Sequence, residues 1–403
     1  MIYSLNTVQC TYYGLQKPQY SETRNRTVET RFLNRIHTAI KGYRHCVYLY
    51  AFIDLNVGDD LFIHKLVSSY PNVRFVLIAR KPYRKIFSRY PNLTIYEVDA
   101  FPLNLCKKLR IDESIRWRIA HDCDYGVYIG GSIFIEYSDW PNQHLWYTEL
   151  FDNERMFLMG CNWGPCKTKQ FEDNMTSVFS GMKDICFRDL YSYNTFSHLP
   201  NVRYAPDILF DMDWSAYAGP ADHKQVMISV VNCRSRSVGL PEYTADYHRF
   251  LSDLTARFTG LGYHVAFCAF WERNGDLAAA EEIRSSLPPQ VREATSAICY
   301  RGTNMDQILR CIAQSEYVIA TRFHAMILGL SAGKKVLPLI YNLKLRTVLE
   351  DLSFQGAFYD IRQLPEDCSH VIEAITCGIS DSDRTRLARL SAGHFDRLNE
   401  MIN

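Results

Sequence analysis

The stretch that decides the fold is Glu316-Tyr-Val-Ile-Ala-Thr-Arg-Phe-His-Ala-Met-Ile-Leu-Gly-Leu-Ser-Ala-Gly333. Its first part, residues 317–320, is a short apolar run typical of a buried strand. Its second part, residues 325–332, has the length and apolar character of a buried helix, which the following glycine ends. Thr321, between the two, is of a type that caps helices. A strand that leads directly into a helix is the repeating unit of a parallel α/β sheet.

The same unit recurs along most of the chain. Strands are expected at residues 47–52, 73–78, 93–98, 126–129, 156–159, 226–231, 264–270, 317–320 and 335–341. Amphipathic or apolar helices are expected at residues 61–70, 167–180, 243–260, 277–286, 305–314, 325–332 and 381–402. This alternation predicts doubly wound parallel sheets.

A break in the pattern at residues 214–225 predicts two domains. This segment is small, polar and contains Gly-Pro, which is typical of a linker, and the alternation restarts after it. We therefore expect two α/β domains of similar size that face each other across a cleft. The predicted parts are an N-terminal extension at 1–45, domains at 46–214 and 226–380, and a C-terminal helix at 381–403.

Composition excludes several classes of protein. The 403 residues are 47% hydrophobic and 22% charged, as in a globular chain of two or three domains. Lys plus Arg is 45 against Asp plus Glu at 44, so a general nucleic-acid binder is not expected. The most apolar segment, 317–341, carries four basic residues or histidines, so no transmembrane segment is expected, although peripheral membrane contact is compatible with the sequence.

The cysteines and the N-terminus predict a cytoplasmic location. The thirteen cysteines are an odd number, and no Cys-x-x-Cys pair exists, so the sequence signals neither a disulfide framework nor a zinc site. The first residues lack the basic and apolar regions of a secretory signal. We expect a chain in a reducing compartment that binds no metal and no cofactor.

Arg322 and His324 follow the strand of the opening stretch directly. Ligands of open α/β sheets bind outside the carboxyl ends of the strands, and a helix N-terminus there favours anions. Arginine adds a permanent charge and histidine a group that titrates near neutrality. The alternative is that Arg322 pairs with a nearby acid and that His324 is structural, and spacing alone favours neither.

Two further basic clusters follow strands of the same domain. Arg234 and Arg236 come after the strand at 226–231, and Lys344 comes after the strand at 335–341. A solvated basic loop would explain the first cluster equally well. Three clusters at one sheet edge nevertheless indicate a small ligand with several negative charges.

An ordered series of motifs resembles the polysaccharide pyruvyl transferase family from about residue 46 to 354. The series consists of Asn56-Val-Gly-Asp-Asp60, Tyr128-Ile-Gly-Gly-Ser132, Gly160-Cys-Asn-Trp-Gly-Pro165, Phe187-Arg-Asp-Leu-Tyr-Ser192, Ala205-Pro-Asp207, Arg322-Phe-His324 and Tyr341-x-x-Lys344. Two departures from the family pattern are visible. Val231-Asn232 stands where the family often has an arginine, a place that Arg234 or Arg236 would take. The glycines that often precede Asn56 are also absent.

The resemblance implies two facing Rossmann-like domains like those of GT-B glycosyltransferases. It also implies transfer of a pyruvyl group from phosphoenolpyruvate to two hydroxyls of one sugar in a polysaccharide or its precursor. The products would be a cyclic ketal and phosphate, with no cofactor. The saccharide acceptor would be free or lipid-linked.

The resemblance and the chemistry together assign roles to residues. His324 is expected to be the general acid, because protonation of the methylene carbon of phosphoenolpyruvate needs a group that titrates near neutrality. The residues expected to bind phosphoenolpyruvate are Arg322, Arg234, Arg236 and Lys344. The residues expected on the acceptor side are Asn56, Asp59, Gly130, Gly131 and Ser132. For these, the alternatives are a plain turn with a helix N-cap at Asp59 and a glycine turn without function.

Two other functions are compatible with the sequence. A glycosyltransferase that uses a nucleotide-sugar donor would place a diphosphate on the same basic residues. A non-catalytic saccharide-binding protein would keep the fold without the reaction. Asp211-Met-Asp213 has the form of a metal-binding Asp-x-Asp, but its place before the linker indicates a solvated turn.

Overall fold

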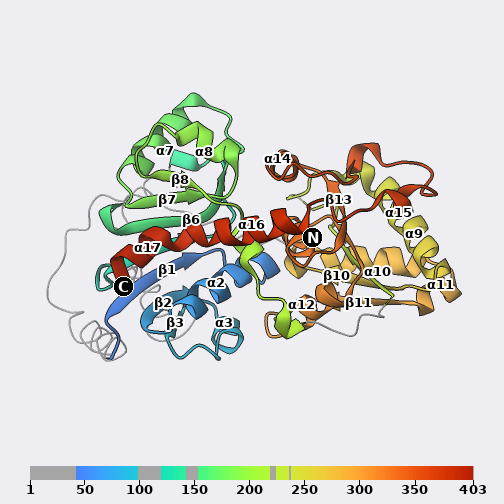
Figure 1. Ribbon diagram of the computed structural model, residues 1–403, viewed down its shortest axis with the longest axis horizontal. Helices are drawn as coiled ribbons and strands as arrows, with labels where there is room; N and C mark the ends of the chain where they lie inside the picture. Colours follow the sequence, from blue (N-terminus) through green and yellow to red (C-terminus); the bar gives the residue numbers. More distant parts are fainter. Residues whose placement is uncertain (1–41, 99–118, 142–152, 218–223, 236, 403) are drawn as a thin grey trace, which may run out of the picture.

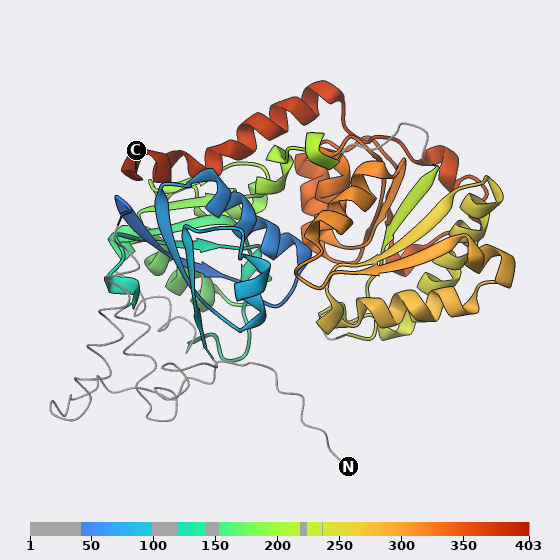
Figure 2. The ribbon, with the colours of Figure 1, turned by 90° about the horizontal axis from the view of Figure 1, so that it is seen from below.

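The computed structural model describes residues 42–98, 119–141, 153–217, 224–235 and 237–402. In these ranges the chain forms two separate parallel sheets with helices on their faces (Figures 1 and 2). The predicted fold class, two Rossmann-like domains, is therefore confirmed. The predicted N-terminal extension lies outside the described residues except for 42–45, and so do residues 218–223 of the linker predicted at 214–225.

The first sheet has the strand order β3-β2-β1-β4-β6-β7-β8, with β5 paired to β6, and every pairing is parallel. Its strands are β1 (His45–Ala51), β2 (Val73–Ala79), β3 (Leu93–Glu97), β4 (Tyr125–Ile129), β5 (Ser132–Phe134), β6 (Met156–Trp163), β7 (Asp184–Phe187) and β8 (Val202–Tyr204). All residues of β6 are buried, as expected of a central strand covered on both faces.

The helices of the first domain are α2 (Val57–Ser69), α3 (Pro82–Ile86), α7 (Lys169–Ser180) and α8 (Leu190–Phe196), with 3₁₀ turns η1 (Asn153–Arg155), η2 (Ile208–Asp211) and η3 (Ser215–Tyr217). Asn56 is the N-cap of α2, because its side chain accepts a hydrogen bond from the Gly58 N–H at 3.0 Å. The alternative of an N-cap at Asp59 is therefore wrong, and Asp59 lies instead in the first helical turn.

The second sheet has the order β11-β10-β9-β12-β13-β14 and is also parallel. Its strands are β9 (Gln225–Ser229), β10 (His264–Ala269), β11 (Thr295–Cys299), β12 (Tyr317–Ala320), β13 (Lys335–Ile340) and β14 (Tyr359–Asp360). Its helices are α9 (Thr244–Gly260), α10 (Asp276–Ser286), α11 (Pro289–Glu293), α12 (Met305–Gln314), α13 (Phe323–Ser331), α14 (Leu343–Asp351) and α15 (Val371–Ala374), with turns η4 (Pro241–Tyr243), η5 (Glu272–Asn274) and η6 (Ile361–Gln363).

The C-terminal segment returns from the second domain to the first (Figure 1). It consists of α16 (Asp381–Ser391), the turn η7 (Ala392–Phe395) and α17 (Asp396–Ile402), so the single helix predicted here is interrupted. Arg203, in β8, donates to the carbonyl oxygens of Gly393 and His394, and the Tyr70 hydroxyl donates to Asn399 at 2.8 Å.

The two domains also share a hydrophobic core. One cluster of buried side chains includes Leu49 and Phe62 of the first domain together with Met326 and Leu328 of the second. None of the helices in the described ranges is both long and apolar enough to cross a membrane.

Candidate active site

The polar residues between the domains follow the carboxyl ends of strands from both sheets. His324 and Lys344 come after β12 and β13, whereas Arg188 and Asp207 come after β7 and β8. Open α/β sheets bind ligands at these ends, and here the ends of two sheets meet. We call Asp59, Arg188, Asp207, His324 and Lys344 the interdomain cluster.

His324 is the second residue of α13 and is only 8% exposed. Its Nε2 lies 3.3 Å from Nη1 of Arg188. Because a guanidinium only donates hydrogen bonds, Nε2 must be the acceptor, which places the proton of the neutral ring on Nδ1. Burial lowers the pKa of His324 well below its ordinary value, and the charges of Arg188 and Lys344 lower it further. The imidazole is therefore neutral in this state of the protein.

Gly58 makes room for this imidazole. A Cβ atom at Gly58 would lie 1.7 Å from Nδ1 of His324, which no side chain could tolerate. The His324 ring also packs edge-to-face against Phe62, which lies on α2 like Gly58, with ring centroids 5.2 Å apart. Helix α2 of the first domain thus fixes the position of a histidine of the second.

Arg188 is fully buried and makes three polar contacts from the first domain. Nη1 donates to Asp207 Oδ2 at 2.8 Å, and Nη2 donates to Asn162 Oδ1 at 2.8 Å. The third contact is the one with His324. A Cβ atom at Gly131 would lie 2.7 Å from Nη2, so the glycine turn is needed for the guanidinium to fit.

Lys344, in the first turn of α14, brings a second cation to the cluster. Its Nζ lies 3.1 Å from Oγ of Ser132 and 4.2 Å from the centroid of the Phe323 ring. The guanidinium carbon of Arg188 also lies 4.2 Å from this centroid. One aromatic ring therefore contacts two cations that come from different domains. Burial and the charge of Arg188 lower the pKa of Lys344 well below its ordinary value, against the opposing effect of Asp59.

Asp59 is the carboxylate of the interdomain cluster whose pKa is raised toward neutrality. It is 8% exposed, and burial raises its pKa to about 6 although the charges of Lys344 and Arg188 oppose the shift. The backbone N–H of Gly131 also opposes the shift. The carboxylate of Asp59, on helix α2, is thus near the glycine turn after β4.

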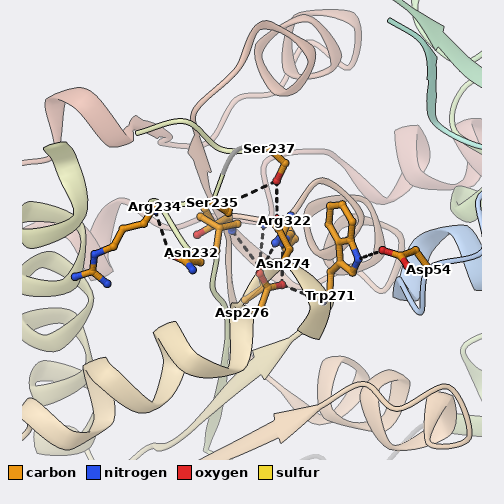
Figure 3. A network of polar contacts seen from close by, with 12 residues as sticks. Asp54, Asn232, Arg234, Ser235, Ser237, Trp271, Asn274, Asp276 and Arg322 are labelled. Carbon is orange, nitrogen blue, oxygen red and sulfur yellow. Dashed lines mark hydrogen bonds and ion pairs between the residues drawn. The ribbon is translucent and has the colours of Figure 1, made fainter. Parts of the chain in front are cut away.

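Arg322 is directed to a different partner. Its Nε donates to Asp276 Oδ2 at 2.9 Å and its Nη2 donates to Oδ1, so the carboxylate is bound bidentately (Figure 3). The guanidinium also lies over the Trp271 ring, 5.4 Å from its centroid. Arg322 is itself the N-cap of α13, so the prediction of a cap at Thr321 is wrong. The Thr321 hydroxyl lies 2.9 Å from the Tyr247 hydroxyl instead.

The other residues predicted at the site are placed as follows. Arg234 is exposed and pairs with Glu282 of α10 at 2.8 Å, and in Figure 3 its guanidinium points away from Arg322. Arg236 lies outside the described residues. Asn56 caps α2 and forms an isolated bridge with Trp271.

The glycine turn predicted on the acceptor side and the Asp-x-Asp sequence both make local contacts. Gly130 hydrogen-bonds through its N–H to the carbonyl of Met159 at 3.3 Å, which leads β4 into the turn beside Arg188. Asp211 pairs with Lys65 at 2.6 Å and Asp213 accepts from the Ser215 N–H at 2.9 Å. Across the described part of the chain, no group of three His, Cys, Asp or Glu side chains is arranged to hold a metal ion.

The sequence model of a family described as polysaccharide pyruvyl transferase matches residues 56–342. The chain belongs to this family. The matched range contains Asp59, Arg188, Asp207 and His324 and ends two positions before Lys344. No curated protein matches the sequence.

Solved structures similar to this pyruvyl transferase family member share its two-domain, GT-B-like fold. UDP-GlcNAc 2-epimerase from Neisseria meningitidis, solved bound to UDP-GlcNAc, has a TM-score of 0.55 and 10% identity over 88% of this chain and 99% of that chain. HepE of Anabaena, solved in complex with UDP-glucose, has a TM-score of 0.53 and 10% identity over 89% and 98%. A glycosyltransferase from Rickettsia africae has a TM-score of 0.51 and 10% identity over 89% and 97%. At these identities the likeness concerns the fold alone.

Sequence reasoning did not single out Arg188, Asp207 and Asn162 as site residues. Arg188 and Asp207 lie in two of the motifs that resemble the family, Arg188-Asp-x-x-Ser192 and Ala205-Pro-Asp207, and these motifs were the available signal. Asn162 lies in a third of these motifs, Gly160-Cys-Asn-Trp-Gly-Pro165, at the end of the buried strand β6.

Proposed function

We propose that this protein transfers the pyruvyl group of phosphoenolpyruvate to two hydroxyls of one saccharide unit, which forms a cyclic ketal and releases phosphate. The observation that carries the proposal is the pair of cations, Arg188 and Lys344, held beside His324. Arg188 is already paired with Asp207 at 2.8 Å, but among the described residues no carboxylate lies within 4.0 Å of the Lys344 ammonium, so the pair suits a further anion, a phosphate or a carboxylate. Phosphoenolpyruvate has both groups on three carbon atoms.

Donor binding would also create the acid that the reaction needs. Burial, Arg188 and Lys344 keep His324 neutral in the free protein. A bound donor with several negative charges offsets the two cations, so the pKa of His324 rises and the imidazole takes up a proton. In this proposal the general acid is charged only when the donor is in place.

In the proposed reaction every proton that is given up is accounted for. The imidazolium of His324 gives its proton to the methylene carbon, which becomes a methyl group, and the carbon that bears the phosphate becomes electrophilic. One acceptor hydroxyl forms a C–O bond there and loses its proton. The C–O bond to phosphate breaks, the second hydroxyl closes the ring, and its proton leaves with the phosphate. The first hydroxyl proton replaces the one that His324 gave.

Arg322 has a positioning role in this proposal. Asp276 binds its guanidinium bidentately, and its own backbone N–H donates to Ser229 at 3.1 Å. These contacts hold the turn between β12 and α13, from which His324 projects. The contribution of Arg322 to donor binding is therefore expected to act through the turn.

Thermal unfolding with candidate donors tests the donor class. Phosphoenolpyruvate at 100 times its Kd is expected to raise the Tm by about 3 °C, since the stabilisation is about 2.7 kcal/mol and the unfolding entropy about 2.1 cal/mol/K per residue. UDP-glucose, UDP-GlcNAc and pyruvate serve as comparison ligands. Arg188→Ala and Lys344→Ala should each abolish the shift, whereas Arg249→Ala, on the exposed face of α9, should keep it.

Phosphate release tests the reaction. Phosphoenolpyruvate is incubated with the protein and a panel of methyl glycosides of galactose, glucose, mannose and N-acetylglucosamine. We expect phosphate release only with glycosides whose hydroxyl pair can close a ketal ring, and matched deoxy-glycosides should be inactive. A Tm shift with the UDP-sugars and none with phosphoenolpyruvate would contradict the proposal in favour of a glycosyltransferase. Binding of glycosides without either donor would favour a saccharide-binding protein.

A further inference from the structure

The reaction proposed above needs a base as well as an acid, and this inference rests on that proposed function. His324 delivers a proton to carbon, and the first acceptor hydroxyl must lose one as its oxygen attacks. General bases in proteins are positioned groups whose pKa lies near the working pH. The carboxylates around the interdomain cluster are the candidates.

Three of these carboxylates are already occupied by other contacts. Asp207 accepts from Arg188 through Oδ2 and from the Leu209 N–H through Oδ1. Asp189 accepts from the N–H and the hydroxyl of Ser192 as the N-cap of α8. Asp276 is held by Arg322. A carboxylate bound in these ways accepts through both oxygens and has its geometry fixed.

Asp59 differs from the other three. Among the described residues its carboxylate accepts from no side-chain donor, and the one backbone N–H that acts on it is that of Gly131. It is largely buried but not sealed, with 8% of its surface exposed. At least one lone pair of the carboxylate is thus available to a ligand that enters the cluster.

The position of Asp59 fits contact with both substrates. The residue before it, Gly58, lies against the imidazole of His324, and the charges of Lys344 and Arg188 act directly on its carboxylate. The carboxylate is also near the N–H of Gly131, in the turn where the family resemblance puts the acceptor. Asp59 therefore lies between the proposed donor cations and the acceptor turn.

We propose that Asp59 is the catalytic base that takes the proton of the first acceptor hydroxyl while that oxygen bonds to the electrophilic carbon. The O–H bond breaks, its electron pair forms the new C–O bond, and the proton passes to the Asp59 carboxylate, from which it returns to His324 or to water. The burial that raises the pKa of Asp59 to about 6 supports this role. Such a carboxylate is ionised at neutral pH and is a stronger base than an exposed aspartate.

The test compares Asp59→Asn with the wild-type protein in two assays. Titration calorimetry with phosphoenolpyruvate alone measures donor binding, and phosphate release with a glycoside accepted by the wild type measures turnover. We expect Asp59→Asn to keep the donor Kd within about threefold or to tighten it, because a negative charge is removed, while kcat falls by about 10²–10⁴-fold. Asp173→Asn, an exposed aspartate of α7, is the matched control and should change neither.

A second pair of readouts separates a base from a structural residue. Acetate should partly restore turnover to Asp59→Ala but not to His324→Ala, and Asp59→Asn should lose the acidic limb of the kcat–pH profile. Asp59→Glu serves if the amide variant does not fold, and its kcat should fall at least tenfold with the donor Kd unchanged.

The outcomes that overturn the inference are distinct from failure of the proposed function. If the wild type binds phosphoenolpyruvate and releases phosphate, but Asp59→Asn or Asp59→Glu keeps the wild-type kcat within threefold, Asp59 is not the base. Parallel loss of donor binding and kcat in Asp59→Asn would also overturn it in favour of a structural role. If phosphoenolpyruvate does not bind the wild type, the proposed function is wrong, and the role of Asp59 as its base is wrong as well.

Discussion

Replacement of Gly58 by alanine is the most direct perturbation of the interdomain cluster. Gly58 is helical, and an alanine in a helix is ordinarily favoured over glycine by about 0.5–1 kcal/mol. At this position the added Cβ would lie 1.7 Å from Nδ1 of His324, whereas ordinary contact begins at 3.4 Å. The imidazole must therefore move by about 1.7 Å, since neither the backbone of α2 nor the packed rings around it can give way so far.

This displacement has a cost in stability and a cost in activity. Overpacking of a buried site costs about 1–3 kcal/mol, so the free energy of unfolding should fall despite the gain in helix propensity. The ring would also leave Arg188, whose Nη1 is 3.3 Å from Nε2. A misplacement of about 1 Å can cost about 10²-fold in rate, so phosphate release should fall at least a hundredfold.

Urea unfolding of Gly58→Ala, His324→Ala and the double variant provides the assay. Without the imidazole the new methyl group has room, so the double variant should be more stable than the sum of the two single changes predicts. Gly260→Ala, a helical glycine with nothing within 4 Å of the added Cβ, is the control and should retain wild-type stability and activity. Additive stability changes, or wild-type turnover in Gly58→Ala, would refute this account of the contact.

Three further predictions concern the charged groups. Arg188→Ala should raise the pKa of His324, because one of the charges that lower this pKa is removed. A ¹⁵N histidine titration by NMR measures the pKa, and an unchanged or lower value would contradict the electrostatic explanation. Asp276→Asn should lower the free energy of unfolding, measured in urea, by about 3–5 kcal/mol, because it leaves the Arg322 charge buried without its counter-ion. A loss below about 1 kcal/mol would show that water or another group takes the place of the carboxylate. Burial raises the pKa of Asp60 from 3.8 to about 8, so the folded protein keeps a proton that the unfolded chain releases. Stability relative to Asp60→Asn should therefore fall as the pH rises from about 4 to about 8, by at most about 1.4 kcal/mol per pH unit, and parallel stability–pH curves would contradict this.

The fold could be predicted from the sequence because apolar strands and helices alternate around the opening stretch, although β11 (Thr295–Cys299) is not among the expected strands. The observed β12 (Tyr317–Ala320) coincides with the expected strand, and α13 begins only two residues before the expected helix. Local patterning decides such elements, because a buried parallel strand needs apolar residues on both faces.

The partners within the site could be predicted only in part. His324 and Lys344 follow neighbouring strands, and the structure does bring them to one cluster. The partner of Arg322 is a residue 46 positions away, and the partner of His324 comes from the other domain, 136 positions away. Contacts of this kind depend on how two sheets are packed together, and no local spacing encodes them.

The path of the last residues has a consequence for biosynthesis. The first domain leaves the ribosome before the second, yet part of its outer layer, α17 and the turn η7, follows the second domain in the chain. Arg203 and Tyr70 contact Gly393, His394 and Asn399 only after the second domain has been synthesised. Until then an incomplete surface of the first domain stays uncovered while the second domain is synthesised. A nascent chain stalled before residue 381 should therefore depend on chaperones, although all strands of its first sheet have already been synthesised.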